Sequence, residues 1–189
     1  MALQEATLDV SYISGIGQGI TTLVYNSNSS MSTEEGNGFG AALLHFAASL
    51  ATGSAPAMPV TLSISLGSLT FKSCDMLCTF ASNNTGVSYT ECTQYMQNQR
   101  QVCMFLAQEQ ITRTSTEFMK IGLRGVSVLA ATGDGGSHYS FQPFPSDRIG
   151  SLLNQVSCAK NFPTYPASDP YVTGVGGTQW TGCTLPWRA

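Results

Sequence analysis

The sequence predicts an α/β domain built on a mostly parallel sheet. Four short runs have the apolar, β-branched or alternating composition of strands: residues 21–25, 60–66, 126–132 and 171–177. Segments with apolar residues at helical spacing separate them. Strands alternating with helices favour parallel pairing through right-handed crossovers. A length of 189 residues suits one domain with a sizeable core.

The first quarter of the chain predicts two helices around a strand. Residues 5–15 have a helical pattern, and residues 21–25 (Thr-Thr-Leu-Val-Tyr) have the composition of a strand. Residues 26–38 are rich in Ser, Asn and Gly and indicate a loop. Residues 39–52 carry apolar side chains at helical spacing, and Gly53 is the expected C-terminal cap.

The middle of the chain predicts a strand, an insertion and one long helix. Residues 60–65 alternate in polarity and lead to Gly67. Residues 71–89 contain Cys and Asn and are expected to form a surface insertion. Residues 90–124 contain no proline and predict a single helix that Gly125 ends.

The last third predicts two buried strands joined by a long connection. Residues 126–131 (Val-Ser-Val-Leu-Ala-Ala) are expected to form a fully buried strand, and residues 171–178 a second one. Residues 137–161 between them are predominantly polar and are expected to form a long connection.

Composition excludes two classes of partner. The net charge is −3, the isoelectric point is near 5.2, and the eight Lys and Arg residues are scattered, which argues against nucleic acid. No stretch reaches transmembrane length, so no membrane partner is expected. The first residues lack the basic start and apolar core of a signal peptide, so the true start is expected upstream.

Cysteines and sequons predict a secretory protein. The six cysteines are an even number, and the sequons at Asn28 and Asn83 lie in polar sequence. Together they favour an oxidising compartment over the cytosol. Several disulfide pairings are possible, and the sequence does not decide between them. The alternative is that some of the cysteines are buried, unreactive thiols.

Three acidic residues stand out in a chain with only 10% charged residues. Glu5 and Asp9 lie four residues apart, so a helix would place both carboxylates on one face. That spacing of like charges destabilises a helix slightly and requires another reason. Asp134 follows a strand and lies between Gly133 and Gly135, where open α/β sheets build their sites. The alternatives are a solvated helix face for the first two and a turn residue for Asp134.

Three motifs resemble the sedolisins, a family of serine-carboxyl peptidases. Residues 5–12 (Glu-Ala-Thr-Leu-Asp-Val-Ser-Tyr) match the family pattern Glu-Ala-x-Leu-Asp-Val-x-Tyr. Residues 132–136 (Thr-Gly-Asp-Gly-Gly) approximate its Ser-Gly-Asp-x-Gly turn. Residues 165–178 (Tyr-Pro-Ala-Ser-Asp-Pro-Tyr-Val-Thr-Gly-Val-Gly-Gly-Thr) closely match its Phe-Pro-Ala-Ser signature. The three occur in the family's order.

The resemblance implies a partial peptidase catalytic domain spanning residues 1–189. The expected fold is subtilisin-like with three layers, incomplete at both ends. Glu5 would be the general base, Asp9 its partner and Asp134 a protonated donor to the oxyanion. The family's nucleophilic serine lies in a Gly-Thr-Ser-Ala segment that this sequence lacks. The complete protein would be an acid-active endopeptidase or tripeptidyl peptidase, whereas the chain alone is expected to be inactive.

The resemblance also implies a peptide-binding edge and a compartment. Ser65, Leu66 and Gly67 would line the substrate, with Gly133 beside them, and a peptide or protein would bind there as an added strand. The family's calcium site lies outside the matching segments, so no cofactor or metal is assigned to this chain. The expected location is secreted or in a lysosome- or vacuole-like compartment.

Two other functions compete with this hypothesis. A non-catalytic, peptidase-like fragment would at most bind peptides. A glycosidase would need two acids across a sugar, whereas Glu5 and Asp9 on successive helical turns suit proton sharing better. The glycines at 15, 17 and 19 lack the dinucleotide-binding spacing, and the two histidines show no zinc spacing.

Overall fold

Three parallel strands form the centre of the molecule. The computed structural model describes residues 2–25, 38–55, 58–99, 102–103, 108–141 and 147–177, without the side chains of residues 2–5 and 38–39. The strands are β1 (Thr61–Ile64), β2 (Ser127–Ala131) and β3 (Thr173–Val175), in the order β1-β2-β3. Both pairs are parallel. The predicted α/β class with a parallel sheet is therefore confirmed.

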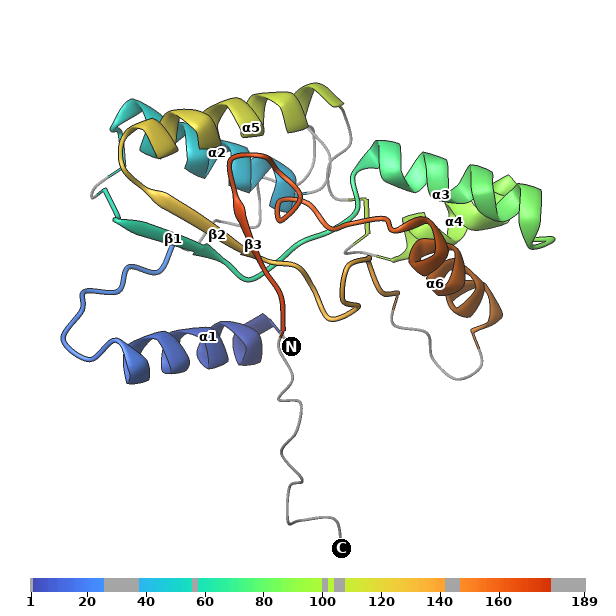
Figure 1. Ribbon diagram of the computed structural model, residues 1–189, viewed down its shortest axis with the longest axis horizontal. Helices are drawn as coiled ribbons and strands as arrows, with labels where there is room; N and C mark the ends of the chain where they lie inside the picture. Colours follow the sequence, from blue (N-terminus) through green and yellow to red (C-terminus); the bar gives the residue numbers. More distant parts are fainter. Residues whose placement is uncertain are drawn as a thin grey trace, which may run out of the picture.

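Two helices cover one face of this sheet. Helices α2 (Gly38–Thr52) and α5 (Gln108–Leu123) pack together over it (Figure 1). Val128 and Ala130 of β2 point into the core that these helices form, while Ser127 is exposed. Among the described residues, ten buried side chains form this core: Leu43, Ala47, Leu50, Ile64, Phe118, Ile121, Val126, Val128, Ala130 and Tyr165. Helix α1 (Ala2–Ile16) lies on the opposite side of the sheet (Figure 1).

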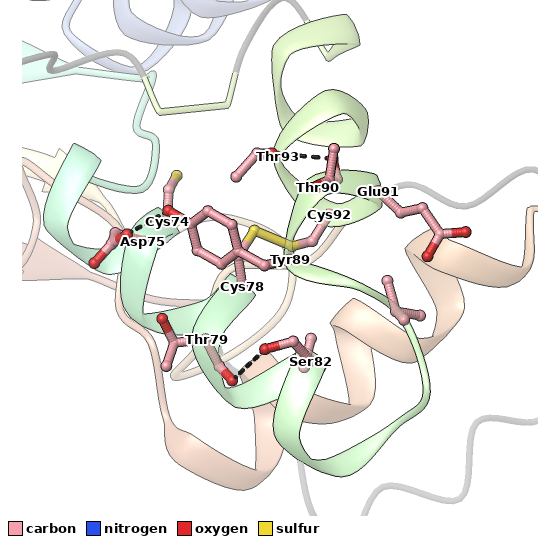
Figure 2. The surroundings of a disulfide bond; sticks show 12 residues. Cys74, Asp75, Cys78, Thr79, Ser82, Tyr89, Thr90, Glu91, Cys92 and Thr93 are labelled. Atoms are coloured by element: carbon pink, nitrogen blue, oxygen red, sulfur yellow. Dashed lines mark hydrogen bonds between the residues drawn. A yellow bond between two sulfur atoms is a disulfide. The ribbon is translucent and has the colours of Figure 1, made fainter.

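A second core lies beyond the carboxyl ends of β1 and β2. Helices α3 (Phe71–Asn84), α4 (Tyr89–Asn98) and α6 (Arg148–Lys160) enclose it (Figure 1). Disulfides Cys74–Cys103 and Cys78–Cys92 fasten it, the latter joining α3 to α4 (Figure 2). Cys158 on α6 is free and exposed, and Cys183 lies outside the described residues.

Polar caps set where these outer helices begin. The Thr70 hydroxyl accepts a hydrogen bond from the Ser73 amide at the start of α3, and the Asp147 carboxylate caps α6. At α4, Ser88 and Glu91 form a reciprocal capping box. The hydrogen bonds that the Glu91 carboxylate accepts from the Ser88 hydroxyl and amide lower its pKa.

The predicted strand at residues 21–25 is wrong. These residues belong to no strand, and Leu23, Val24 and Tyr25 are exposed. β propensity stabilises a strand only when a neighbour supplies hydrogen bonds and packing, and no described segment pairs with this one. The Tyr25 ring instead stacks on Phe46 of α2, with ring centroids 4.1 Å apart.

The single helix predicted for residues 90–124 is two helices. Helix α4 ends at Asn98 and α5 begins at Gln108. Cys103 in the connection has a φ of 60° and is bonded to Cys74, so it cannot continue a right-handed helix. The disulfide, which the sequence left open, explains an interruption that no proline marks.

Four other expectations need correction. Residues 71–89, expected as a surface insertion, contain α3, which buries one face in the second core. The connection predicted at 137–161 contains α6. Strand β2 alternates between buried and less buried residues because helices α2 and α5 cover only one of its faces, so it is not fully buried. Strand β3 is exposed throughout.

The remaining predictions of helices hold. Helix α1 contains the predicted residues 5–15, and α2 contains all of 39–52. Gly53 and Gly125 follow α2 and α5 with positive φ angles of 78° and 86°, as C-terminal caps require. The loop predicted at 26–38 and the sequon at Asn28 lie almost wholly outside the described residues. The subtilisin-like assignment stays a prediction.

Candidate active site

The candidate site lies at the carboxyl edge of the sheet. Residues 65–68 follow β1, and residues 132–136 follow β2. The two strands are parallel neighbours, with Ile64 opposite Ala130, so both loops emerge side by side from the same edge. This is the edge at which open α/β proteins bind their ligands.

Asp9 lies against the first of these loops. The Ser65 hydroxyl donates a hydrogen bond to Asp9 Oδ1, with an oxygen–oxygen distance of 3.3 Å. This contact joins residues 56 positions apart and brings α1 to the end of β1. Asp9 is half-buried. Glu5 lies one helical turn earlier in α1, and its side chain is outside the described residues.

A tight glycine loop carries Asp134. Gly133 and Gly136 have φ angles of 88° and 82°, a region that residues with a Cβ rarely adopt. A Cβ on Gly135 would lie 2.6 Å from both His138 O and Ser140 Cβ. The loop therefore needs its glycines, and the Asp134 side chain remains exposed.

A third segment, residues 162–169, lies against both loops. Ser68 and Tyr165 exchange two backbone hydrogen bonds in an antiparallel bridge, with N–O distances of 2.9 Å and 2.8 Å. The Thr164 hydroxyl donates to the carbonyl oxygen of Thr132 at 2.9 Å. A Cβ on Gly67 would lie 3.1 Å from Tyr165 O, so this glycine permits close backbone packing. Leu66 beside it is 40% exposed.

A buried Tyr–Asp pair supports this third segment. The Tyr165 hydroxyl donates to Asp169 Oδ2 at 3.0 Å, and the Tyr171 amide donates to Asp169 Oδ1 at 2.9 Å. Both Tyr165 and Asp169 are almost fully buried. Burial first, and the Asp169 carboxylate second, raise the pKa of Tyr165, which therefore stays protonated and keeps donating.

An open groove lies on the far side of this segment. It has a volume of about 490 Å³ and runs between α5 and residues 165–171. Hydroxyl-bearing residues Thr112, Ser115 and Ser168 line it together with Ile111. Sequence analysis did not predict it.

The described residues contain no cluster of three or more His, Cys, Asp or Glu side chains able to hold a metal ion. His45 is exposed on α2, and His138 lies in the loop after Asp134. Among the described helices, none combines the length and apolar character needed to cross a bilayer.

Several curated proteins align with the chain. Tripeptidyl-peptidase 1 of the dog, Canis lupus familiaris, is 27% identical over 177 residues, which is 93% of this chain and 22% of that protein. Aorsin of Aspergillus oryzae is 40% identical over 67 residues, 35% of this chain and 10% of that protein. Tripeptidyl-peptidase sed1 of Aspergillus fumigatus is 43% identical over 67 residues, with the same coverage of each chain.

The chain is similar to sedolisin peptidases, in agreement with the resemblance of its motifs. The chain spans only about a tenth to about a fifth of the length of these curated sedolisins. No family model matches the chain, and no solved structure matches it significantly.

The structure brings together part of the site expected from the sedolisin motifs. Asp9 contacts Ser65, and Gly67 and Gly133 both lie against Thr164. Asp134 lies on the adjacent loop of the same edge. The catalytic and substrate-binding roles of these residues, and of Glu5 and Leu66, stay predictions.

Sequence analysis missed Thr164 and the Tyr165–Asp169 pair as supports of the site. The motif at 165–178 contains Tyr165 and Asp169, but its pattern indicates a family resemblance and not which residues are in contact. Thr164 precedes that motif, and its partner is a backbone carbonyl, which no side-chain pattern reveals.

Proposed function

We propose that this chain supplies the acidic part of the active site of a serine-type peptidase. Glu5 and Asp9 form the base and its partner, and Asp134 donates to the oxyanion. The nucleophilic serine comes from a segment outside these 189 residues. The substrates are peptides or proteins, cleaved by an endopeptidase or a tripeptidyl peptidase.

The observation that carries the proposal is the contact between Asp9 and Ser65. An i, i+4 carboxylate pair on a solvated helix would have no reason to approach the sheet. Here α1 instead meets the carboxyl end of β1, beside the loop with Asp134. The names of the aligned proteins, tripeptidyl-peptidases, independently support a peptidase.

The chemistry requires acidic conditions. Two nearby carboxylates that share a proton disfavour the doubly ionised state, which makes one of them a better base than an isolated acid. A carboxyl group can donate a hydrogen bond to an oxyanion only when it is protonated. Both steps therefore favour a pH well below neutral.

The substrate would bind as an extra strand along Ser65, Leu66 and Gly67. Backbone hydrogen bonds supply affinity in that mode, and a glycine lets the two backbones approach closely. Gly133 would offer a similar open backbone on the neighbouring loop. Peptide binding at Ser65–Gly67 and at Gly133 would require no nucleic acid, membrane or cofactor.

An acidic, oxidising location fits this chemistry. The two disulfides are typical of a secretory history, and Asn83 of the second sequon is exposed on α3. A secreted protein or one in a lysosome- or vacuole-like compartment meets both conditions. The calcium site that the sedolisin resemblance implies would lie outside these 189 residues.

Cleavage of a fluorogenic peptide library at pH 4 tests the proposal. The 189-residue chain should show no turnover, because it contains no Gly-Thr-Ser-Ala segment. A longer protein that contains this chain and such a segment should cleave peptides, and Glu5→Gln should lower kcat at least about 100-fold. Ser54→Ala is the matched control, since Gly53-Ser-Ala55 only resembles that segment and lies at the end of α2.

Two outcomes would contradict the proposal. Turnover by the chain alone that Ser54→Ala abolishes would show that the nucleophile is assigned wrongly. No turnover by a longer protein with the serine segment would favour the alternative, a peptide-binding fragment without catalysis.

A further inference from the structure

We propose that Thr164 is a positioning residue that holds the substrate edge at Gly67 and the Asp134 loop at a fixed separation. The inference rests on the proposed function, because it concerns the same site. Thr164 is 5% exposed and lies between the two loops, on neither of them.

Each part of the Thr164 side chain faces a different partner. Its hydroxyl donates to the Thr132 carbonyl at 2.9 Å. Its Cβ would lie 3.4 Å, and its Cγ2 3.5 Å, from a Cβ placed on Gly67 and Gly133 respectively. A side chain at either glycine would therefore touch Thr164, which shows that the Thr164 side chain lies close to both glycine backbones. One side chain thus spans both walls of the proposed peptide site.

The backbone of Thr164 is held from both directions. Its carbonyl accepts a hydrogen bond from the Ser168 amide at 3.0 Å. Tyr165, the next residue, makes the two-bond bridge to Ser68. The side chain therefore projects from a fixed point, and its contacts transmit that position to the loops.

The Thr164 hydroxyl acts through its hydrogen bond to the Thr132 carbonyl. β2 ends at Ala131, and Thr132 O belongs to the peptide plane that leads into Gly133. A hydrogen bond to this carbonyl orients that plane at the entrance to a loop whose glycines offer little restraint of their own. The direction in which Asp134 leaves the sheet therefore depends on a group that never touches the substrate.

The experiment is an NMR titration of the ¹⁵N-labelled 189-residue chain with an acetylated, amidated alanine pentapeptide. Thr164→Val keeps the shape and removes the donor, whereas Thr164→Ser keeps the donor. Thr114→Val is the matched control, because Thr114 is fully buried on α5 and its hydroxyl donates to the Gln110 carbonyl at 2.8 Å. Hydrogen exchange of the Ser68 and Thr132 amides is measured on the same samples.

The expected result is specific to Thr164→Val. Losing one neutral hydrogen bond should raise the Kd for the peptide roughly three- to tenfold. It should also speed hydrogen exchange at the Ser68 and Thr132 amides. Thr164→Ser should stay within about twofold of the parent Kd, since it retains the donor. Thr114→Val should lower unfolding stability without changing the Kd or the relative exchange at these two amides.

The proposal is overturned if Thr164→Val and Thr114→Val give the same Kd and the same exchange. If the parent chain binds no peptide, the proposed function fails at its substrate edge, and the exchange data alone decide. Faster exchange at Ser68 and Thr132 only in Thr164→Val would then still support the positioning role.

Discussion

Gly135 shows most directly how single residues shape the loop that carries Asp134. The loop folds back so tightly that His138 O and Ser140 occupy the space of a side chain at this position. The position of Asp134 therefore depends on Gly135, a residue without a side chain.

Gly135→Ala should destabilise the protein by about 1–3 kcal/mol, because backbone atoms must shift to admit the methyl group. Gly122→Ala on α5 is the control: nothing lies within 4 Å of its added Cβ, and helix propensity should raise stability by up to about 1 kcal/mol. Urea unfolding measures both. Equal stability of Gly135→Ala and the parent would show that the loop is wider than described.

Helix α4 illustrates how an element can respond to pH. Its capping box depends on the ionised Glu91 carboxylate, which accepts hydrogen bonds from the amide and hydroxyl of Ser88. These bonds lower the pKa of Glu91 in the folded chain. The contribution to stability is therefore complete above the ordinary glutamate pKa of about 4.3 and is lost as the pH falls through the lowered value.

Glu91→Gln should remove this pH dependence. Circular dichroism of urea unfolding at pH 7, 5 and 3 should show that the difference in midpoint between the parent and Glu91→Gln narrows toward pH 3. A difference that stays constant over this range would contradict a titrating cap. Because the proposed activity requires acid, the same measurement shows how much stability the outer helices retain under working conditions.

The sequence predicted the boundaries of helices and strands wherever neighbouring residues determine them. Helices α1 and α2 and strands β1 and β2 were predicted because apolar periodicity and terminal glycines act over a few residues. The break between α4 and α5 was not predicted, because it depends on a disulfide between Cys103 and the distant Cys74. The predicted strand at 21–25 failed because strand formation requires a partner.

The candidate site divides in the same way. The motifs predicted that Asp9, Asp134 and Gly67 share one edge of the sheet, because strand ends and glycine turns are visible in sequence, and the structure places all three at that edge. Their functional roles stay predictions. Thr164 was missed because its hydrogen bond reaches a backbone carbonyl 32 residues away. A buried hydrogen bond from a side chain to a distant backbone carbonyl produces no periodic pattern in the sequence.

On the scale of the whole molecule, the side of the sheet that faces α1 differs from the side that faces α2 and α5. Tyr12 and Ile16 of α1, and Ile20, Leu23 and Val24 after it, are all more than 60% exposed. Exposed apolar side chains that are concentrated on one helix and the segment after it favour association. We expect the 189-residue chain to associate as its concentration rises.

Sedimentation velocity from 5 to 200 µM, roughly the range over which weak association becomes visible, measures this. The double variant Ile16→Lys/Ile20→Lys should shift the chain toward monomer, because it places two charges on the exposed apolar residues. A monomer at every concentration, in both proteins, would contradict the expectation.

In the proposed function, Asp134 acts as a protonated donor beside an acidic pair. The most direct test is kcat/KM against pH for a longer protein that contains this chain and the serine segment. If two protons are needed, log(kcat/KM) should fall with a slope near about −2 on the basic side, and Asp134→Asn, a donor at every pH, should reduce that slope to about −1. An unchanged slope in Asp134→Asn, with unchanged kcat/KM, would show that Asp134 is not a proton-dependent donor.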